Sequence, residues 1–310
     1  MRVLFKVRNA ASEEYERMAG GLDTTGRTVA EQVTDRLRST PVEGGLGLRV
    51  SELRADGCRM WLPIPPVEPD LDGRQEAVGV AVALDVLADT AGGVAVSICV
   101  GKGLGSPTIE LRIDHVAPPA EDAGWMVADS TVPHVAAGAG YATGLVHDDT
   151  GRLLARAHGH YVETTPETSI GELPPSDRPG STFPSIGPRG GPGELLAALA
   201  PSADDPADWS LPADSALANP RGHVQGGVLM TLGQLAQRRV QAANLSHAVA
   251  PRPLSLQAEY LRPAPIDGTP LRCRTRYVRH GRRFRTLRSE LVRADGRIAT
   301  IVTGLWASGS

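Results

Sequence analysis

The hydrophobic residues of this chain form two kinds of pattern, which predict helices first and strands afterwards. Residues 12–40 contain two helical candidates, the second over residues 28–37, where apolar side chains recur at helical spacing until Pro41 ends the run. Residues 46–63 instead alternate with period two around an Ala-Asp-Gly break at 55–57. That pattern predicts a hairpin with an Asp-Gly turn.

The most apolar long stretch is residues 78–98, which predicts a helix buried on most of its sides. Runs with strand character follow it, separated by Pro-Pro, Gly-rich and Asp-Thr-Gly breaks. The predicted strands cover residues 108–116, 125–135, 141–147 and 152–162. One long helix followed by a meander of strands indicates an α+β fold.

The second half of the chain repeats the first. Residues 109–118 match residues 254–263, and residues 151–155 match residues 296–300, both at an offset of 145. A constant offset over segments about 40 residues apart indicates a tandem duplication. The chain then divides into an N-terminal helical segment (1–44), a first repeat (45–163), a Pro/Gly-rich linker (164–193) and a second repeat (194–310).

Composition narrows the class of protein. Of the 310 residues, 41% are hydrophobic and 22% charged, and the formal net charge of −3 gives no whole-protein attraction to nucleic acid or anionic membrane. The three cysteines have unrelated spacings, so neither a disulfide framework nor a metal site is expected. No stretch is expected to reach the 18 or more apolar residues of a membrane span, and the N-terminus lacks a signal-peptide core. A cytoplasmic protein is expected.

The segment 219–232 joins a loop of turn-forming residues to an apolar helix through Gly226 and Gly227. A helix N-terminus presents free backbone N–H groups, and glycines let a ligand approach them closely. This junction is therefore a candidate site for an oxygen that carries negative charge.

Two motifs carry a family resemblance. The run Asn219-Pro-Arg-Gly-His-Val-Gln-Gly-Gly227 resembles the Asn-x-x-Gly-x-x-His-Gly-Gly stretch of hotdog-fold acyl-CoA thioesterases of the PaaI-like type, within the 4-hydroxybenzoyl-CoA thioesterase superfamily. Leu87-Ala-Asp89 is similar to the Leu-Ala-Asp on the family's central helix. The resemblance implies a tandem double hotdog, in which each repeat wraps an antiparallel sheet of about five strands around a long helix. It also implies a homodimer of such chains.

In that family the active site lies between paired units, one giving the Asn loop and Gly-Gly helix start and the other a carboxylate. By the 145-residue offset, Asp89 stands opposite Gln234 and Gln225 opposite Val80, so neither repeat holds both parts. The resemblance therefore implies one composite site per chain. Its expected catalytic residues are Asp89, Gly226, Asn219, Gln225 and Thr108.

Each of these residues has an expected role in hydrolysis of an acyl-CoA thioester. Asp89 would act as nucleophile or general base, and the Gly226 N–H would polarise the carbonyl. By resemblance, Asn219 would orient the water, and Thr108 would hold a water-binding hydroxyl. No cofactor is expected, because coenzyme A enters as part of the substrate. The residues expected to contact the substrate are Gly222, His223, Gly227, Arg279 and Arg282.

Several alternatives stay open. Asp85, one turn before Asp89, is the second candidate acid, and Gln225 replaces the family's histidine. The arginines from 272 to 285 fit a solvated sheet face, or a patch for coenzyme A phosphates. A non-catalytic acyl-CoA-binding protein is the first alternative function. A hotdog hydratase or dehydratase is the second, with His223 as its only available base.

Overall fold

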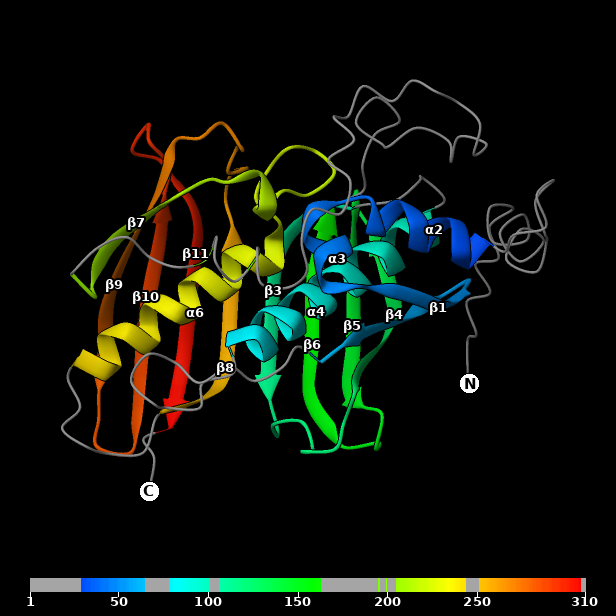
Figure 1. Ribbon diagram of the computed structural model, residues 1–310, viewed down its shortest axis with the longest axis horizontal. Coiled ribbons are helices and arrows are strands. Elements are labelled where there is room, and N and C mark those ends of the chain that lie inside the picture. Colours follow the sequence, from blue (N-terminus) through cyan, green and yellow to red (C-terminus); the bar gives the residue numbers. More distant parts are fainter. Residues whose placement is uncertain are drawn as a thin grey trace, which may run out of the picture.

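Two long helices lie against one face of a single antiparallel sheet (Figure 1). The computed structural model describes residues 29–64, 78–100, 106–162, 205–243 and 251–307, together with Leu195 and Leu199. The helices are α2 (Val29–Arg38), α3 (Pro41–Leu46), α4 (Val78–Val100), the short 3-10 helix η1 (Ser215–Leu217) and α6 (Gly226–Ala243). The first of the two helices predicted within residues 12–40 and the predicted linker (164–193) lie outside the described residues.

The sheet is mirrored about its centre. Its strand order is β1-β2-β4-β5-β6-β3-β8-β11-β10-β9-β7, and every pairing between neighbours is antiparallel. Within the described residues the first half contributes six strands and the second half five. The strands are β1 (Arg49–Arg54), β2 (Gly57–Pro63), β3 (Thr108–His115), β4 (Trp125–Ala136), β5 (Ala139–Asp148), β6 (Leu153–Val162), β7 (Asp208–Pro212), β8 (Arg252–Tyr260), β9 (Pro270–His280), β10 (Phe284–Val292) and β11 (Ile298–Ala307).

The structure keeps the offset of the sequence repeat. Strands β4, β5 and β6 begin at residues 125, 139 and 153, and β9, β10 and β11 begin at 270, 284 and 298, each 145 residues later. At the centre of the sheet β3 pairs with β8, and Arg112 lies opposite Gln257, its own counterpart in the repeat. The two halves are therefore related by a pseudo-two-fold axis at this pair.

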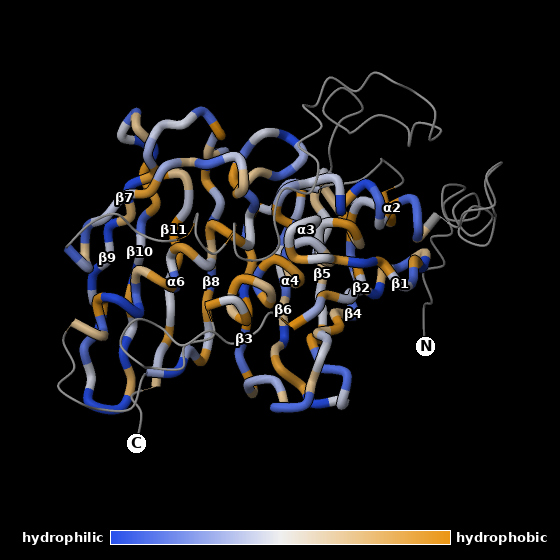
Figure 2. The backbone as a smooth tube through the Cα atoms, in the orientation of Figure 1, coloured by the Kyte–Doolittle hydropathy of each residue, from blue (hydrophilic) through white to orange (hydrophobic). Residues whose placement is uncertain are grey.

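Helix α4 is the buried centre of the first half. Every residue from Ala81 to Ile98 is buried, as the strongly apolar composition of this stretch predicts. It packs on β2, β4 and β5, while α6 packs on β9, β10 and β11, and the two helices contact each other. Hydrophobic residues follow α4 and the adjoining strands in Figure 2. One continuous hydrophobic cluster accordingly includes residues of both halves.

The sequence was expected to contain no stretch long and apolar enough to span a membrane, and this expectation is wrong. Helix α4 has 23 residues and is apolar enough to cross a bilayer, but 94% of its most apolar window is buried inside the protein. Its hydrophobic residues are thus already covered by the sheet and by α6.

The predicted hairpin forms, but it begins later than the alternation suggested. Strands β1 and β2 pair across the turn at Ala55 and Asp56. Leu46, expected in the strand, instead ends helix α3, which begins at Pro41. Proline is well tolerated at the first position of a helix, because the N–H that it lacks would have no partner there. Helix α3 contacts η1 of the second half, so the N-terminal segment reaches the loop that precedes α6.

Candidate active site

A cavity of about 680 Å³ lies where the two halves and the N-terminal segment meet. Helix α4, strand β3, the start of α6 and the end of β8 all contribute to its wall, together with α2 and α3. Six of the residues expected in the site line it: Asp89, Thr108, Asn219, His223, Gln225 and Gly226. The cavity is therefore the place where the sequence-derived candidates converge.

Asp89 is the centre of the hydrogen bonding in this cavity. The Thr108 hydroxyl donates to its Oδ1 at 2.7 Å. The Gln225 side-chain amide and the Gly227 backbone N–H donate to Oδ2 at 3.0 Å and 3.2 Å. Thr108 belongs to the first half, whereas the other two donors belong to the second. The carboxylate of one half is thus held by the helix start of the other.

Burial sets the ionisation of Asp89. Its side chain is only 6% exposed, and desolvation raises its pKa from 3.8 to about 6. The hydrogen bonds from Thr108, Gly227 and Gln225 favour the charged form and limit this rise. Asp89 is therefore ionised at neutral pH, with a pKa close to the range in which a general base works well.

Gln225 has two functions at this junction. Its Oε1 accepts a 3.0 Å hydrogen bond from the Val228 backbone N–H, so it caps the N-terminus of α6. This bond orients the amide, because its NH2 group must then face away from the helix. The NH2 group donates to Asp89 and, at 3.3 Å, to the Thr90 hydroxyl. The glutamine in the family's histidine position thus still donates a hydrogen bond to the acid.

The two glycines of the junction serve different contacts. A Cβ built on Gly226 would lie 2.6 Å from Oδ2 of Asp89, so only glycine lets the acid come this close. A Cβ on Gly227 would lie 2.6 Å from backbone atoms of Asp85 and Val86, where α6 crosses α4. Within the described residues the Gly226 N–H donates to no group. Gly226 lines the cavity and Gly227 does not.

The loop before α6 is stabilised by Asn219. Its Oδ1 accepts hydrogen bonds from the backbone N–H groups of Arg221 and His223 at 2.9 Å and 3.1 Å. Gly222 has a φ of +72° and makes the turn, but it does not line the cavity. His223 does line it, and burial followed by the charge of Arg221 lowers its pKa. No hydrogen bond joins His223 to Asp89 within the described residues.

Three other candidates, and the residue equivalent to Asp89 in the second repeat, lie outside the cavity wall. Asp85 is fully buried between α4 and α6, where the Thr231 hydroxyl donates to it at 2.9 Å. Gln234 stands in the position equivalent to Asp89 and is also buried. Arg279 and Arg282 are exposed at the end of β9 and in the turn after it.

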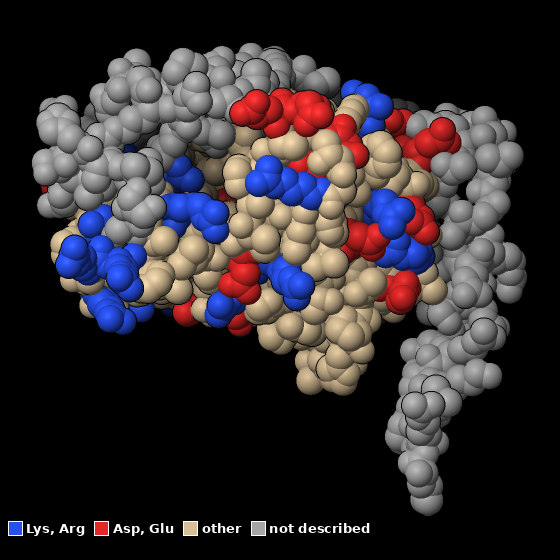
Figure 3. Space-filling view, turned by 90° about the horizontal axis from the view of Figure 1, so that it is seen from below, with Lys and Arg blue, Asp and Glu red and all other residues tan. Residues whose placement is uncertain are grey.

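Arg272, Arg274 and Arg276 are exposed on β9 and alternate with buried residues, as expected for a solvated sheet face. Figure 3 shows a group of Lys and Arg side chains at the end of the molecule formed by the second half. This sheet face is separate from the cavity, since none of its arginines lines the cavity.

The sequence did not indicate several polar residues of the cavity. Glu43 of α3 lines it and is 3% exposed, and Thr90 lies beside Asp89 on α4. The Tyr260 hydroxyl donates to the Gly226 carbonyl at 2.9 Å. Three arginines also contribute to the lining: Arg36, Arg221 and Arg262.

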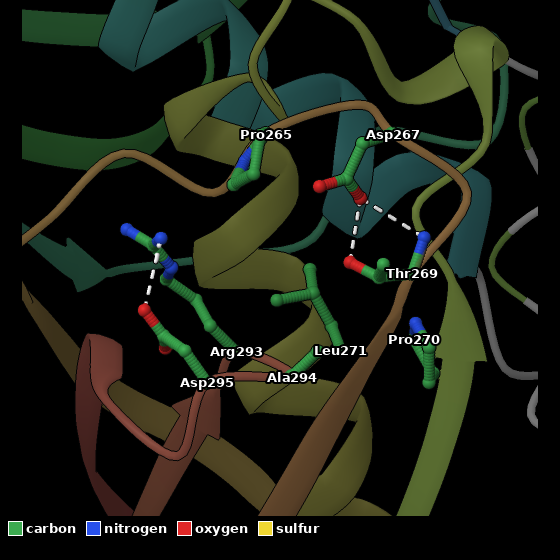
Figure 4. Close-up of a pocket in the computed structure, with 8 residues that line it drawn as sticks. All are labelled: Pro265, Asp267, Thr269, Pro270, Leu271, Arg293, Ala294 and Asp295. Atoms are coloured by element: carbon green, nitrogen blue, oxygen red, sulfur yellow. Dashed lines mark hydrogen bonds and ion pairs between the residues drawn. The ribbon is translucent and has the colours of Figure 1, made fainter.

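A second pocket, of about 150 Å³, lies at the surface of the second half (Figure 4). Its polar groups are bound to one another, with Asp267 accepting from Thr269 and Arg293 paired with Asp295 at 3.1 Å. Among the described residues no group of three His, Cys, Asp or Glu side chains could hold a metal ion. The larger cavity is thus the better candidate for chemistry.

Two family models match the chain, one in each half. A model of the acyl-CoA thioesterase C-terminal domain matches residues 13–159, and a model of the acyl-CoA thioesterase N-terminal domain matches residues 217–308. Together the two models cover well over half of the chain. The C-terminal model matches the first half of this chain and the N-terminal model matches the second half, which is the reverse of the order in their names. Because a pseudo-two-fold axis relates the two halves, exchanging their order along the chain gives the same pairing of halves.

Solved structures show the same fold. A tesB protein from Mycobacterium avium subs paratuberculosis aligns with a TM-score of 0.53 at 9% identity, covering 89% of this chain and 99% of that one. A protein of unknown function with a hot dog fold from Alicyclobacillus acidocaldarius aligns with a TM-score of 0.50 at 12% identity, covering 89% and 98%. A search of curated proteins found no match.

Proposed function

Because this chain belongs to the hotdog-fold acyl-CoA thioesterases, we propose that its cavity hydrolyses the thioester of an acyl-CoA. The observation that carries the proposal is the Asp89 carboxylate, held by Gln225 and Gly227 of the other half inside a cavity large enough for an acyl group. A single composite site per chain follows from the same arrangement. Its counterpart across the pseudo-two-fold axis has Gln234 in place of the acid.

In the proposed reaction Asp89 acts as a nucleophile on the thioester carbonyl or as the base that deprotonates water. A C–O bond forms, the C–S bond breaks, and the coenzyme A thiolate takes up a proton. The products are a carboxylic acid and coenzyme A. The proposed reaction needs water and no further cofactor.

The start of α6 is the proposed site for the developing negative charge. The Gly227 N–H is already engaged by Asp89, which leaves the Gly226 N–H for the thioester oxygen. It points from the N-terminal end of a helix of 18 residues, where the helix dipole also favours negative charge. Asn219 then supports catalysis by fixing the loop, because its Oδ1 is engaged by backbone N–H groups.

Coenzyme A carries phosphates, and arginine is well suited to bind them. Arg36, Arg221 and Arg262 line the cavity, so we propose them as phosphate ligands in preference to Arg279 and Arg282. The pairing of chains into a homodimer stays a prediction.

Release of free thiol from a panel of acyl-CoAs of different chain lengths tests the proposed function. We expect turnover with at least one of them. Binding of acyl-CoA without turnover on any chain length would favour the non-catalytic alternative. The hydrogen bond from Gln225 to Asp89 supports the catalytic reading, since the glutamine supplies a donor where the family has histidine.

A further inference from the structure

Glu43 brings a second buried carboxyl group to the cavity. It lies on α3, in the N-terminal segment before the first strand, and lines the same cavity as Asp89. The Thr90 hydroxyl connects the two acids. It accepts a hydrogen bond from the Gln225 amide and donates to Oε1 of Glu43 at 3.4 Å, while the same amide donates to Asp89. Glu43 is thus two hydrogen bonds away from the amide that holds the catalytic acid.

The hydrogen bonding around Glu43 favours a proton on its carboxyl group. Thr40 Oγ1 is hydrogen-bonded both to the Leu37 carbonyl, 2.6 Å away, and to Oε2 of Glu43. A threonine hydroxyl has one hydrogen, and a carbonyl can only accept. An ionised Glu43 would leave one hydrogen for two acceptors, whereas a protonated Glu43 supplies the second hydrogen itself.

The charges around Glu43 agree with a neutral acid. Burial is the main cause that raises its pKa from 4.5 to about 7. The negative charge of Asp89 on α4 adds to the rise, and the hydrogen bonds with Thr40 and Thr90 oppose it. The other ionisable groups that line the cavity come from α2, the loop before α6, and β8 with the residues after it. They are Arg36, Arg221, His223, Tyr260 and Arg262.

We propose that Glu43 is a positioning residue of the thioesterase site, which must be protonated for full activity and so sets the upper pH limit of the reaction. This inference rests on the proposed function. Neutral Glu43 fixes the Thr90 hydroxyl, and through it the Gln225 amide, without adding charge. Once ionised, it places a second negative charge beside Asp89, where the reaction itself builds negative charge on the thioester oxygen. Repulsion of that kind in a partly buried site slows the reaction on the order of 10-fold or more.

The test is the pH dependence of kcat/KM for the wild type and Glu43→Gln. Glutamine keeps a donor for Thr40 and an acceptor for Thr90 but cannot ionise. The wild type is expected to gain activity as pH rises through about 6, where Asp89 ionises, and to lose it as pH rises through about 7. Glu43→Gln should keep the rise and lack the fall. An alkaline fall that is the same in both proteins would overturn the inference.

A second measurement needs no turnover. Infrared spectra of the free protein carrying Asp85→Asn, which removes the buried acid of highest pKa, should show a carboxylic acid band of Asp89 that disappears with a midpoint near pH 6, and a second carboxylic acid band that disappears with a midpoint near pH 7. Glu43→Gln in the same background should remove this second band. A spectrum without it would show that Glu43 is ionised and would overturn the inference. If no thiol is released but this band is present, the result would contradict the proposed function and not the protonation of Glu43.

Discussion

The Gln225 amide donates a 3.0 Å hydrogen bond to Oδ2 of Asp89 although the two residues are 136 positions apart. The same glutamine caps α6 through the Val228 N–H, so the bond that fixes the acid also fixes the helix start. The position of Asp89 and the position of the α6 N–H groups are therefore coupled. Both parts of the proposed catalytic machinery depend on the packing of one half against the other.

Thr108→Val tests the control of the Asp89 pKa. Valine has the shape of threonine but cannot donate the 2.7 Å hydrogen bond to Oδ1. That bond stabilises the carboxylate, so its loss raises the pKa of Asp89 above about 6. Activity should then appear only at higher pH. Because a hydrogen bond to a charged group contributes about 1.5–3 kcal/mol, the ionised fraction of Asp89 and with it kcat/KM at pH 6 should fall about 7-fold to 80-fold. An unchanged acid limb would show that Thr108 does not act on Asp89.

The two junction glycines should respond differently to alanine. In Gly226→Ala the new methyl group meets the Asp89 carboxylate, a side-chain end that can move, so the fold should persist while activity drops on the order of 100-fold. In Gly227→Ala the methyl group meets the α4 backbone, which cannot move as easily. That variant should lose about 1–3 kcal/mol of unfolding free energy. Denaturant unfolding and thiol release on both variants measure the contrast, and equal losses of stability would contradict it.

Asp85 should make stability depend on pH. The single hydrogen of the Thr231 hydroxyl faces both Asp85 and the Gly227 carbonyl, so a proton on Asp85 satisfies both contacts. Burial raises its pKa from 3.8 to about 8. The folded state therefore binds a proton that the unfolded state releases, and this stabilisation is lost as pH rises from about 4 through about 8.

Unfolding of the wild type and Asp85→Asn at pH 5 and pH 8 measures this effect. The wild type should be less stable at pH 8, and the difference should shrink in Asp85→Asn. The remainder would come from Glu43 and Asp89, whose pKa values are also raised. The same difference in both proteins would mean that Asp85 is not protonated in the fold.

Much of this fold could be predicted from the sequence, because buried faces leave periodic patterns. The strands after α4 begin where alternation predicted them to within about two residues, since each buries one face against a helix. Helix α3 left no such pattern, as it has six residues and includes two glycines. Its place depends on contacts with the preceding helix α2 and with η1, which is distant in sequence.

Site residues could be predicted where their residue type differs from that of their neighbours in the sequence. Asp89 is one of two carboxylates in a mostly apolar helix, and the Gly226-Gly227 pair starts the other helix. Glu43 had no comparable signal, because a glutamate in a short segment without apolar periodicity looks like a surface residue. Its burial comes from packing that brings it to Thr90, 47 residues away. The expectation for Arg279 and Arg282 came from the run of arginines and from the phosphates of coenzyme A, and neither shows where a side chain lies relative to the cavity.

Thiol release by Asp89→Asn, compared with Asp85→Asn, tests the central claim most directly. Both aspartates are buried on α4 one turn apart, but only Asp89 lines the cavity. Asparagine cannot act as nucleophile or base, so Asp89→Asn should lower kcat/KM by about 100-fold or more. Asp85→Asn, which replaces a neutral acid by a neutral amide, should stay within a few fold of the wild type. Equal turnover by Asp89→Asn and the wild type would contradict the assignment of the site.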